Sequence, residues 1–409
     1  MNLKKVESLI LKEFNKKNHF NFKRINVAFP YFNQKEIVAV LDSLLNLQIS
    51  QGEKTRYFES KFAKYINMPF ASAVNSGSSA NLIALAALID LGKLKEGDEI
   101  IVPSTTFATV VSPIYQLGLV PVYVDVEYEN INIDTSKIEN AISKKTKIIM
   151  PVHTLGFPAE MDTIKRIARK YNLLIFEDCC EAHGAKYKNK YVGSLGDVST
   201  WSFFVAHNLT TGEGGMILSK NKNLHNSIKS IREFGRLINY RSRFSSSNKM
   251  KDFDSRYMFM KKGYNVRLTD IASAIGIEQL KKLNSINVKR RKNAKYLSNL
   301  LSEFKEIYIP KPKKDHTCAY YGFPIILNDK SFSRKYLCNF LEKNNIETRS
   351  IMGGCLPDQP AFYKQTHRIS GNLNTSRSIK NNAFFIGIHA ALEKEHLDKI
   401  YFAFKAFFR

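Results

Sequence analysis

The stretch ASAVNSGSSANLIALAALID, residues 71–90, decides the fold class of this chain. Its first five residues are typical of a strand buried on both faces, and residues 78–90 have a helical pattern. The same order of strand and helix continues to about residue 220, with strand-like runs at 99–103, 120–126, 147–152 and 173–178 and helical patterns at 108–118 and 159–172. This alternation predicts an α/β fold, with a mostly parallel sheet flanked by helices. In such sheets, ligands bind beyond the carboxyl ends of the strands.

The sequence also predicts three regions. Residues 1–24 form an N-terminal helical extension, and residues 25–262 form the large α/β domain, which ends in a basic stretch at 237–262. Residues 263–409 form a smaller C-terminal α/β domain, because a long basic helix to about residue 304 is followed by further strand and helix patterns. Those patterns are strands near 320–327 and 346–351, a helix near 331–343 and a C-terminal helix.

Composition excludes several classes of protein. The net charge is +25, but the lysines and arginines are scattered over nearly every helix and no nucleic-acid-binding signature accompanies them, so we expect a solvated basic surface. No apolar run is long enough to span a bilayer, and the N-terminus lacks the cleavage site of a signal peptide. The five cysteines include no metal-binding cluster, which indicates reduced thiols and no metal site. We therefore expect a cytoplasmic protein that binds neither nucleic acid nor membrane.

Four stretches at predicted strand ends carry candidate site residues. NSGSSAN (75–81) offers helix amides and hydroxyls that can cradle a phosphate, although serine and glycine also simply cap helices. PSTTFATVV (103–111) offers Phe107, either for stacking on a planar ring or as a core aromatic. FEDCCEAHG (176–184) ends a strand at Asp178, either a partner for a protonated ring nitrogen or a helix cap.

The fourth stretch is WSFFVAHNLTTGEGGMI (201–217), which places Ser202 and His207 before a loop rich in glycine and threonine. Together the four stretches offer a phosphate cradle, a stacking face, a carboxylate and an imidazole. These are the groups that a protein uses to bind pyridoxal phosphate.

At this point the chain resembles the sugar aminotransferase family, which has the aspartate-aminotransferase type fold (fold type I). The similarity runs from about Ile25 to the C-terminus through NSGSSANL, PSTTFATVV, PVHTLGFPAEMD, EDCCEAHGAKY, VGSLGDVSTWSFF, TTGEGGMI and GYNVRLTDIASAIGIEQL. The resemblance implies that Phe107 stacks on the pyridine ring and that Asp178 pairs with its nitrogen. It implies a homodimer in which Asn265 reaches the phosphate of the other subunit. The remaining cofactor-binding residues that it implies are Gly77, Ser78, Ser79 and Ser202.

One position departs from the family pattern. His207 stands where aminotransferases have the lysine that binds the coenzyme covalently, which an imidazole cannot do. The same substitution characterises a branch of the family, the sugar 3-dehydratases acting on nucleotide-linked 4-keto-6-deoxy sugars. The resemblance to this branch implies non-covalent pyridoxal and pyridoxamine phosphate, L-glutamate as amino donor and His207 as the general base. An aminotransferase, or a homologue without turnover, is the alternative.

Other details of the site stay open at this stage. Glu181 replaces the usual neutral glutamine near the 3′ oxygen of the coenzyme, or lies on a helix surface. His153 is a candidate substrate contact, and the candidate cations for a pyrophosphate are Arg236, Arg241, Arg243, Arg256 and Arg267. The nucleotide is GDP by one resemblance and CDP by another, and the sugar is a hexose or a heptose. CDP-linked enzymes hold an iron–sulfur cluster through cysteines in the region of 237–262, where this chain has none, so we expect no cluster.

A regulator of transcription built on this fold is a further class. It needs an added winged-helix module, and the roughly 25 residues before the similarity begins are fewer than a domain of about 50 residues requires. The sequence therefore favours an enzyme.

Overall fold

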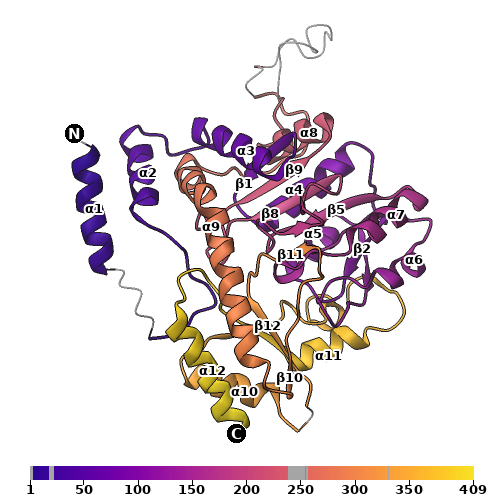
Figure 1. The fold of residues 1–409 in the computed structure, drawn as a ribbon. Coiled ribbons are helices and arrows are strands. Elements are labelled where there is room, and N and C mark those ends of the chain that lie inside the picture. Colours follow the sequence, from indigo (N-terminus) through magenta and orange to yellow (C-terminus); the bar gives the residue numbers. More distant parts are fainter. Residues whose placement is uncertain (1–2, 18–22, 238–253, 255–256, 330) are drawn as a thin grey trace.

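The computed structural model describes residues 3–17, 23–237, 254, 257–329 and 331–409, and Figure 1 shows two layered regions joined by a long helix. The larger region contains an 8-stranded sheet in the order β1-β9-β8-β5-β4-β2-β3-β14. Every neighbouring pair is parallel except those of β9, which is antiparallel to β1 and β8. The strands are β1 (Phe70–Val74), β2 (Glu99–Pro103), β3 (Val120–Val124), β4 (Thr146–Ile149), β5 (Leu174–Asp178), β8 (Val198–Ser202), β9 (Gly215–Ser219) and β14 (Arg368–Ile369).

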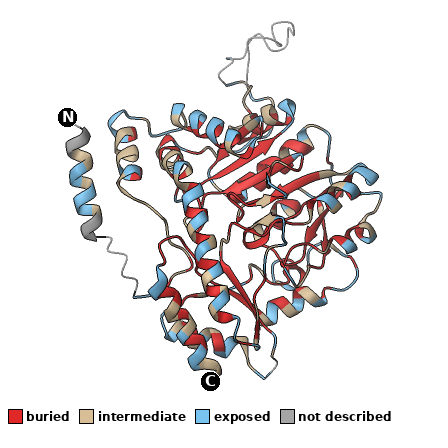
Figure 2. Cartoon of the chain, viewed as in Figure 1, coloured by how far each residue is buried: buried red, intermediate tan, exposed pale blue. Residues whose placement is uncertain are grey.

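Helices cover both faces of this sheet. Along β2 the side chains alternate, because Ile101 packs into the core on one face while Ile100 and Val102 pack into the core on the other. The first face is covered by α3 (Glu53–Ile66), α6 (Ile138–Ala141), α7 (Met161–Tyr171) and the start of α9 (Asp270–Leu301). The second face is covered by α4 (Gly77–Asp90), α5 (Ala108–Gln116) and α8 (Lys222–Arg232). β2, β8 and β9 are buried throughout their length, and β1, β3, β4 and β5 are buried except at one half-buried residue each, whereas the edge strand β14 is partly exposed (Figure 2).

The smaller region is built on an antiparallel 4-stranded sheet in the order β10-β12-β15-β13. Its strands are β10 (Ile307–Tyr308), β12 (Phe323–Leu327), β13 (Thr348–Ser350) and β15 (Ala383–Ile386). The end of α9, together with α10 (Arg334–Lys343) and α12 (Lys394–Phe408), packs on it. A third, 3-stranded sheet contains β6 (Lys186–Tyr187), β7 (Lys190–Tyr191) and β11 (His316–Thr317).

The chain passes between the two regions more than once. Ile25 bridges to Ile346 and packs in the core of the smaller region, although the sequence placed it at the start of the large domain. In the other direction, Arg368 and Ile369 of β14 extend the large sheet beside β3. α11 (Asn374–Asn382) then returns the chain to β15. The two regions therefore share an extensive boundary, and the candidate site lies on it.

The N-terminal segment forms α1 (Leu3–Lys17), as the sequence predicts, followed by α2 (Gln34–Leu45), which packs on α9. α1 stands beside α2 at the margin of the molecule (Figure 1). None of the helices in the described ranges combines the length and apolar character needed to cross a bilayer.

The predicted α/β class is confirmed, with a mostly parallel sheet between helices and a smaller sheet from the C-terminal part. The predicted strands at 99–103 and 173–178 coincide with β2 and β5 within one residue. The predicted helix at 78–90 is α4. Most of the basic stretch 237–262 lies outside the described residues, as do Arg241, Arg243 and Arg256.

Candidate active site

A cavity of about 560 Å³ lies where the loops after β1, β2, β5 and β8 meet the smaller region. This is the edge at which the sequence predicts a site. The predicted residues that line it are Gly77, Ser78, Phe107, Asp178, Glu181, Ser202 and His207. Residues from the smaller region form the opposite wall.

The start of α4 forms the end of the cavity suited to a phosphate. Ser76 caps the helix, since its hydroxyl accepts a hydrogen bond from the Ser79 amide at 3.0 Å. A Cβ on Gly77 would lie 2.6 Å from the Cβ of Ser202, so only glycine lets the helix approach the end of β8 this closely. Helix amides with the hydroxyls of Ser78 and Ser202 make a compact anion cradle. Ser79 lies on the cradle helix but bonds to Asn75 Oδ1 at 2.6 Å and does not line the cavity.

Asp178 ends β5 and presents a buried carboxylate to the cavity. One oxygen accepts a hydrogen bond from the Cys180 amide at 3.0 Å, and the other accepts one from Asn81 Nδ2 at 2.9 Å. Asn81 is itself oriented by the Thr200 hydroxyl, which donates to Asn81 Oδ1 at 2.6 Å. Among the described residues no cation pairs with Asp178, so the carboxylate remains available to a protonated nitrogen in the cavity.

Phe107 precedes α5 and is 55% exposed, which places its ring in the open cavity and excludes the role of a core aromatic. A free aromatic face at the side of a cavity is suited to a planar ring. Of the two roles that the sequence left open for Phe107, the structure therefore favours stacking.

His207 lies on the far side of the cavity, in a tight turn closed by a hydrogen bond from its amide to the Phe204 carbonyl at 3.0 Å. Its Nδ1 is buried without a hydrogen-bond partner in the described chain, so Nε2 is the nitrogen that faces the cavity. Burial, with a contribution from the nearby Arg290 charge, lowers the pKa of His207 to about 3. The imidazole is therefore neutral at neutral pH and can accept a proton.

In the loop after His207, Gly212 has a positive φ of 82°, and close packing accounts for Gly214 and Gly215. A Cβ on Gly215, the first residue of β9, would overlap the Ser76 carbonyl at the start of α4. Phe203 and Thr211 then hydrogen-bond across the loop, from the Thr211 amide to the Phe203 carbonyl at 2.9 Å. The loop thus returns the chain along β8 while leaving the phosphate cradle open.

Glu181 lies fully inside the protein at the cavity, which excludes the helix-surface role that the sequence left open. Its Oε2 accepts a hydrogen bond from the Leu155 amide at 2.5 Å. Burial, together with the charge of Asp178, raises the pKa of Glu181 to about 8, against the opposing effect of the Leu155 amide. At neutral pH the carboxyl is mostly protonated and can donate a hydrogen bond, as a glutamine amide does.

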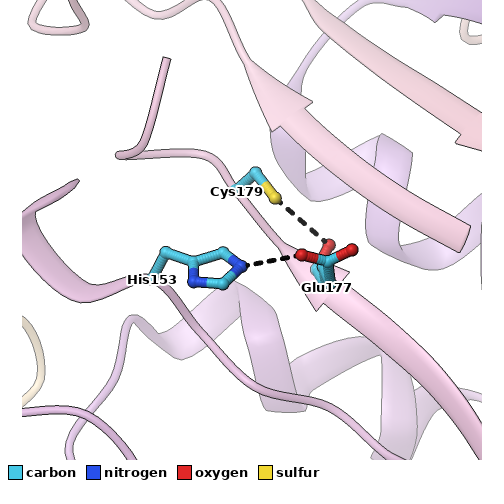
Figure 3. A group of neighbouring side chains, drawn as sticks. All are labelled: His153, Glu177 and Cys179. Atoms are coloured by element: carbon cyan, nitrogen blue, oxygen red, sulfur yellow. Dashed lines mark hydrogen bonds and ion pairs between the residues drawn. The ribbon is translucent and has the colours of Figure 1, made fainter. Parts of the chain in front are cut away.

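His153 does not line the cavity, although the sequence made it a candidate substrate contact. Figure 3 shows it beside Glu177 and Cys179, the one group in the described part of the chain with the spacing of a metal site. His153 Nδ1 accepts from the Ala159 amide at 3.0 Å, so its Nε2 donates to Glu177 Oε2 at 3.0 Å. Burial opposes ionisation of Glu177, but its hydrogen bonds from His153 and from backbone amides lower its pKa. The group is a saturated structural network.

Asn265, Arg236 and Arg267 lie together outside the cavity lining. Arg267 donates to Asn265 Oδ1 at 3.1 Å and pairs with Glu233 at 3.3 Å, and Arg236 pairs with the same Glu233 at 3.6 Å. The neighbouring Val266 carbonyl accepts from the Asn75 amide, and Asn265 itself is exposed. Within one chain these residues therefore do not reach the cavity, and Asn265 is accessible to a second subunit.

The opposite wall comes from the smaller region, and sequence reasoning missed it. Among the described residues that line the cavity, Arg349 is the only one that is a lysine or an arginine. It forms an ion pair with one carboxylate oxygen of Glu347, and the other oxygen accepts a hydrogen bond from the Val27 amide at 2.8 Å. Tyr321 packs on His207, with ring centroids 5.0 Å apart. The sequence places these residues only in stretches expected to form strands, at 320–327 and 346–351, and contacts between distant segments, such as the bond from the Tyr321 amide to the Leu155 carbonyl, bring them to the cavity.

The residues present fit pyridoxal phosphate. The cradle takes an anion, the buried Asp178 lacks a cation in the described chain, and Phe107 offers a free ring face. Asn81, which holds Asp178, was also missed, because its place within NSGSSAN gives no sign of its contact with β5.

Curated relatives cover nearly the whole chain. The lipopolysaccharide biosynthesis protein RfbH of Salmonella typhimurium is 37% identical over 390 residues, 91% of this chain and 89% of the relative. The dTDP-4-dehydro-2,6-dideoxy-D-glucose 3-dehydratase of Saccharopolyspora spinosa is 35% identical, covering 90% of this chain and 83% of the relative. The GDP-4-keto-6-deoxy-D-mannose 3-dehydratase of Yersinia pseudotuberculosis is 32% identical, covering 93% and 98%.

Solved structures agree with this similarity. The GDP-4-keto-6-deoxy-D-mannose 3-dehydratase of Escherichia coli with bound hydrated pyridoxal phosphate superposes with a TM-score of 0.87 at 30% identity, covering 93% of this chain and 98% of that one. A structure of GDP-4-keto-6-deoxymannose 3-dehydratase with a trapped pyridoxal phosphate–glutamate geminal diamine gives the same TM-score, 0.87, at 30% identity, covering 93% and 99%. The model of the DegT/DnrJ/EryC1/StrS aminotransferase family matches residues 30–405, and this chain belongs to that family.

Proposed function

We propose that this protein is a C3-dehydratase of a nucleotide-linked 4-keto-6-deoxy sugar, dependent on pyridoxal phosphate and L-glutamate. Its product is a 3,6-dideoxy-4-keto sugar for surface polysaccharides. The observation that carries the proposal is the position of His207. It is a neutral imidazole at a cavity whose other residues offer a phosphate cradle, an aromatic face and a carboxylate for the coenzyme. Solved relatives with 3-dehydratase names and bound coenzyme support it.

In this proposal the large region would hold the coenzyme without a covalent bond. The α4 amides with Ser78 and Ser202 would bind its phosphate, Phe107 would stack on its ring, and Asp178 would keep its ring nitrogen protonated. Glu181, in its protonated form, would donate to the 3′ oxygen of the coenzyme. When bound in its amine form, the coenzyme supplies the amino group that condenses with the C4 ketone and the ring that stores an electron pair.

His207 moves the proton. As a neutral base it would take a proton from the C4′ carbon of the bound coenzyme, and as the resulting imidazolium it would give a proton to the departing C3 hydroxyl. A buried imidazole beside the Arg290 charge holds that proton weakly, which favours its transfer. A lysine at this position could instead bind the coenzyme covalently or return a proton to C4, which completes transamination.

In this proposal glutamate would supply the amino group that restores the amine form of the coenzyme and would leave as 2-oxoglutarate. Overall, the sugar and glutamate give the 3-deoxy sugar, 2-oxoglutarate and ammonia, so the electron pair that reduces C3 comes from glutamate. The reaction therefore needs no iron–sulfur cluster. The relative structure with a trapped glutamate adduct supports glutamate as the donor.

The substrate enters against the smaller region. We propose GDP as the nucleotide, following the relatives with GDP-linked substrates, with a CDP-linked or dTDP-linked sugar as the alternative. Among the described residues that line the cavity, Arg349 is the cation that we assign to the pyrophosphate of the substrate. Asn265, Arg236 and Arg267 do not line the cavity of their own chain, and following the family resemblance we assign Asn265, with these two arginines, to the site of the partner in a homodimer.

A panel of GDP-, CDP- and dTDP-linked 4-keto-6-deoxy sugars, each incubated with the protein, coenzyme and L-glutamate, tests the proposal. We expect free ammonia and a product that lacks the C3 oxygen, by mass spectrometry, with one preferred nucleotide. A stable amino sugar without ammonia release would identify an aminotransferase, which the family as a whole favours. Absence of any product from the whole panel would identify a homologue without turnover.

A further inference from the structure

Tyr321 is fixed beside His207 by contacts from three parts of the chain. Its amide donates to the Leu155 carbonyl at 3.0 Å, and its carbonyl accepts from Arg290 Nη1 at 3.1 Å. The same guanidinium also donates to the Tyr320 carbonyl at 2.9 Å. Arg290 is fully buried within α9, so these bonds hold the residue before β12 in one place. The position of Tyr321 is therefore determined by the scaffold.

The side chain of Tyr321 faces the cavity next to the base. Its ring centroid lies 5.0 Å from that of His207 and 5.9 Å from that of Phe385. Phe204 is the other cavity-lining ring in contact with His207, at 6.4 Å, and it carries no polar atom. Among the described residues, Tyr321 is thus the one that carries a hydroxyl, lines the cavity and has its ring in contact with the ring of His207.

The groups around this phenol keep it a donor. Burial, with the nearby Glu181 carboxyl, raises the pKa of Tyr321, while Arg290 and Arg349 act in the opposite direction. The net effect leaves the hydroxyl protonated throughout the working range of pH. In the described chain no side chain takes its hydrogen bond, so the donor is free for a ligand.

Resting on the function proposed above, we propose that Tyr321 is a catalytic residue whose hydroxyl donates a hydrogen bond to the C3 hydroxyl of the sugar as that group leaves. The C3–O bond breaks with its electron pair on oxygen, the His207 imidazolium supplies the proton, and water departs. Tyr321 keeps its own proton and stabilises the charge that develops on oxygen. Because the residues that would hold the coenzyme belong to the large region, the sugar would occupy the side of the cavity where Tyr321 lies.

The other polar groups of this wall are already engaged. Glu181 accepts from the Leu155 amide, and its own proton is the one assigned above to the 3′ oxygen of the coenzyme. Arg349 pairs with Glu347. His183 touches the His207 ring at 5.7 Å but is enclosed by Phe62, Trp201 and Phe203 and does not line the cavity. The Asp178 carboxylate accepts a hydrogen bond from Asn81 Nδ2. None of them offers a free neutral donor beside the base.

The experiment compares Tyr321→Phe with a matched control, Tyr320→Phe. Tyr320 is the preceding residue, packs edge-on against Phe157 at 5.5 Å and does not line the cavity, so its variant makes the same change outside the site. Three quantities are measured: the spectral conversion of the coenzyme by glutamate alone, the Kd of the nucleotide sugar by calorimetry, and the single-turnover rate of ammonia release.

For Tyr321→Phe we expect the glutamate conversion and the Kd to stay within about twofold of wild type, while ammonia release slows about 100-fold, the effect of losing one transition-state donor. Tyr320→Phe should match wild type in all three. An unchanged rate in Tyr321→Phe would overturn the role of Tyr321. Equal losses in conversion, Kd and rate would also overturn it, because they indicate a structural role. A wild-type protein that converts coenzyme with glutamate but releases no ammonia with any sugar would overturn the proposed function itself.

Discussion

The behaviour of His207 follows from its surroundings more than from its residue type. Burial lowers its pKa to about 3, with Arg290 as the second cause. Arg290 is a buried cation that donates hydrogen bonds to two backbone carbonyls, and no carboxylate of the described chain pairs with it. Such a charge disfavours any further positive charge nearby. The residue therefore rests as a base and, once protonated, releases its proton readily.

Glu181→Gln tests the protonated state of the carboxyl at the cavity. The pKa of Glu181 is about 8 in the folded protein against an ordinary 4.5, so the folded state binds more protons between these values. Stability from this group is therefore present below about pH 4.5 and is lost as pH rises through about 8. Glutamine mimics the protonated form, so we expect the variant to gain stability relative to wild type as pH rises from 5 to 9, measured by thermal unfolding.

Glu213→Gln is the matched control, because Glu213 also lines the cavity but is exposed. It should follow wild type at every pH. Parallel curves for wild type and Glu181→Gln would show that Glu181 is ionised in the folded protein and that its carboxyl is not the donor at the 3′ oxygen.

At the residue scale the sequence predicted the groups that follow strands. Four of these residues lie at or just after the carboxyl ends of strands in one sheet: Phe107, Asp178, Ser202 and His207. The carboxyl ends of parallel strands lie at the same edge of a sheet, so these residues meet there. Tyr321 could not be predicted, because its contact with His207 depends on long-range hydrogen bonds with Leu155 and Arg290. Pairwise contacts between distant segments leave no periodic trace in a single sequence.

At the scale of elements, the coenzyme cradle depends on close approach of α4 and β9. A Cβ on Gly215 would overlap the Ser76 carbonyl and lie 2.9 Å from the Gly77 amide. Both are backbone groups and cannot move aside as a flexible side chain could. The first turn of α4 therefore keeps its position only while residue 215 has no side chain.

Gly215→Ala should displace that turn. We expect a loss of about 1–3 kcal/mol in the free energy of unfolding, the usual cost of overpacking. We also expect weaker binding of pyridoxal phosphate, because the amides and Ser78 no longer converge. Urea unfolding and a spectral titration of the coenzyme measure the two effects.

Ser79→Ala is a suitable control, since Ser79 lies in the same turn but does not line the cavity. It should retain coenzyme affinity. If Gly215→Ala bound coenzyme as tightly as wild type, the cradle would not depend on this packing.

Element prediction succeeded where one pattern covers a whole segment. The predicted long basic helix is α9, a single helix of 32 residues that packs against both regions. It failed to anticipate β14, because two residues paired beside β3 have no pattern of their own and are held by the contact of Arg368 with Glu99 at 2.9 Å. Long-range pairing, which the sequence does not display, decides such short strands.

At the scale of the whole molecule, several buried imidazoles make stability sensitive to acid. Burial is the main cause that lowers the pKa of His207 and of His389 to about 3 and that of His225 to about 4, and His183 is shifted in the same direction. Their ordinary value is 6.5, so the unfolded state binds more protons below that pH. Stability should fall as pH drops from about 6.5 towards 4.

Urea unfolding at a series of pH values measures how the free energy of unfolding changes with pH. Glu181 contributes in the opposite direction, but it is one group against several imidazoles. His225→Gln should make the slope shallower, because His225 is remote from the cavity and its removal takes away one of the titrating groups. A free energy of unfolding that is constant or rises on acidification from pH 6.5 to 5 would show that these imidazoles are not held neutral by burial.

The proposed homodimer predicts complementation between two inactive variants. His207→Ala loses the base of its own site, and Asn265→Ala loses the residue given to the site of the partner. In a hybrid dimer one of the two sites recovers both native residues, so mixing and refolding equal amounts should restore about a quarter of wild-type activity. The control is each variant mixed with itself, which should stay inactive. No recovery in a verified hybrid would show that Asn265 acts within its own subunit.

The central claim, that one imidazole drives loss of the C3 oxygen, is tested most directly by a single turnover. Wild type and His207→Ala are loaded with pyridoxamine phosphate, mixed with the preferred nucleotide sugar and followed by mass spectrometry for the deoxygenated product. We expect the alanine variant to bind coenzyme normally and to form product about 1000-fold more slowly, as loss of a general base implies. Product formation by His207→Ala at the wild-type rate would contradict the claim.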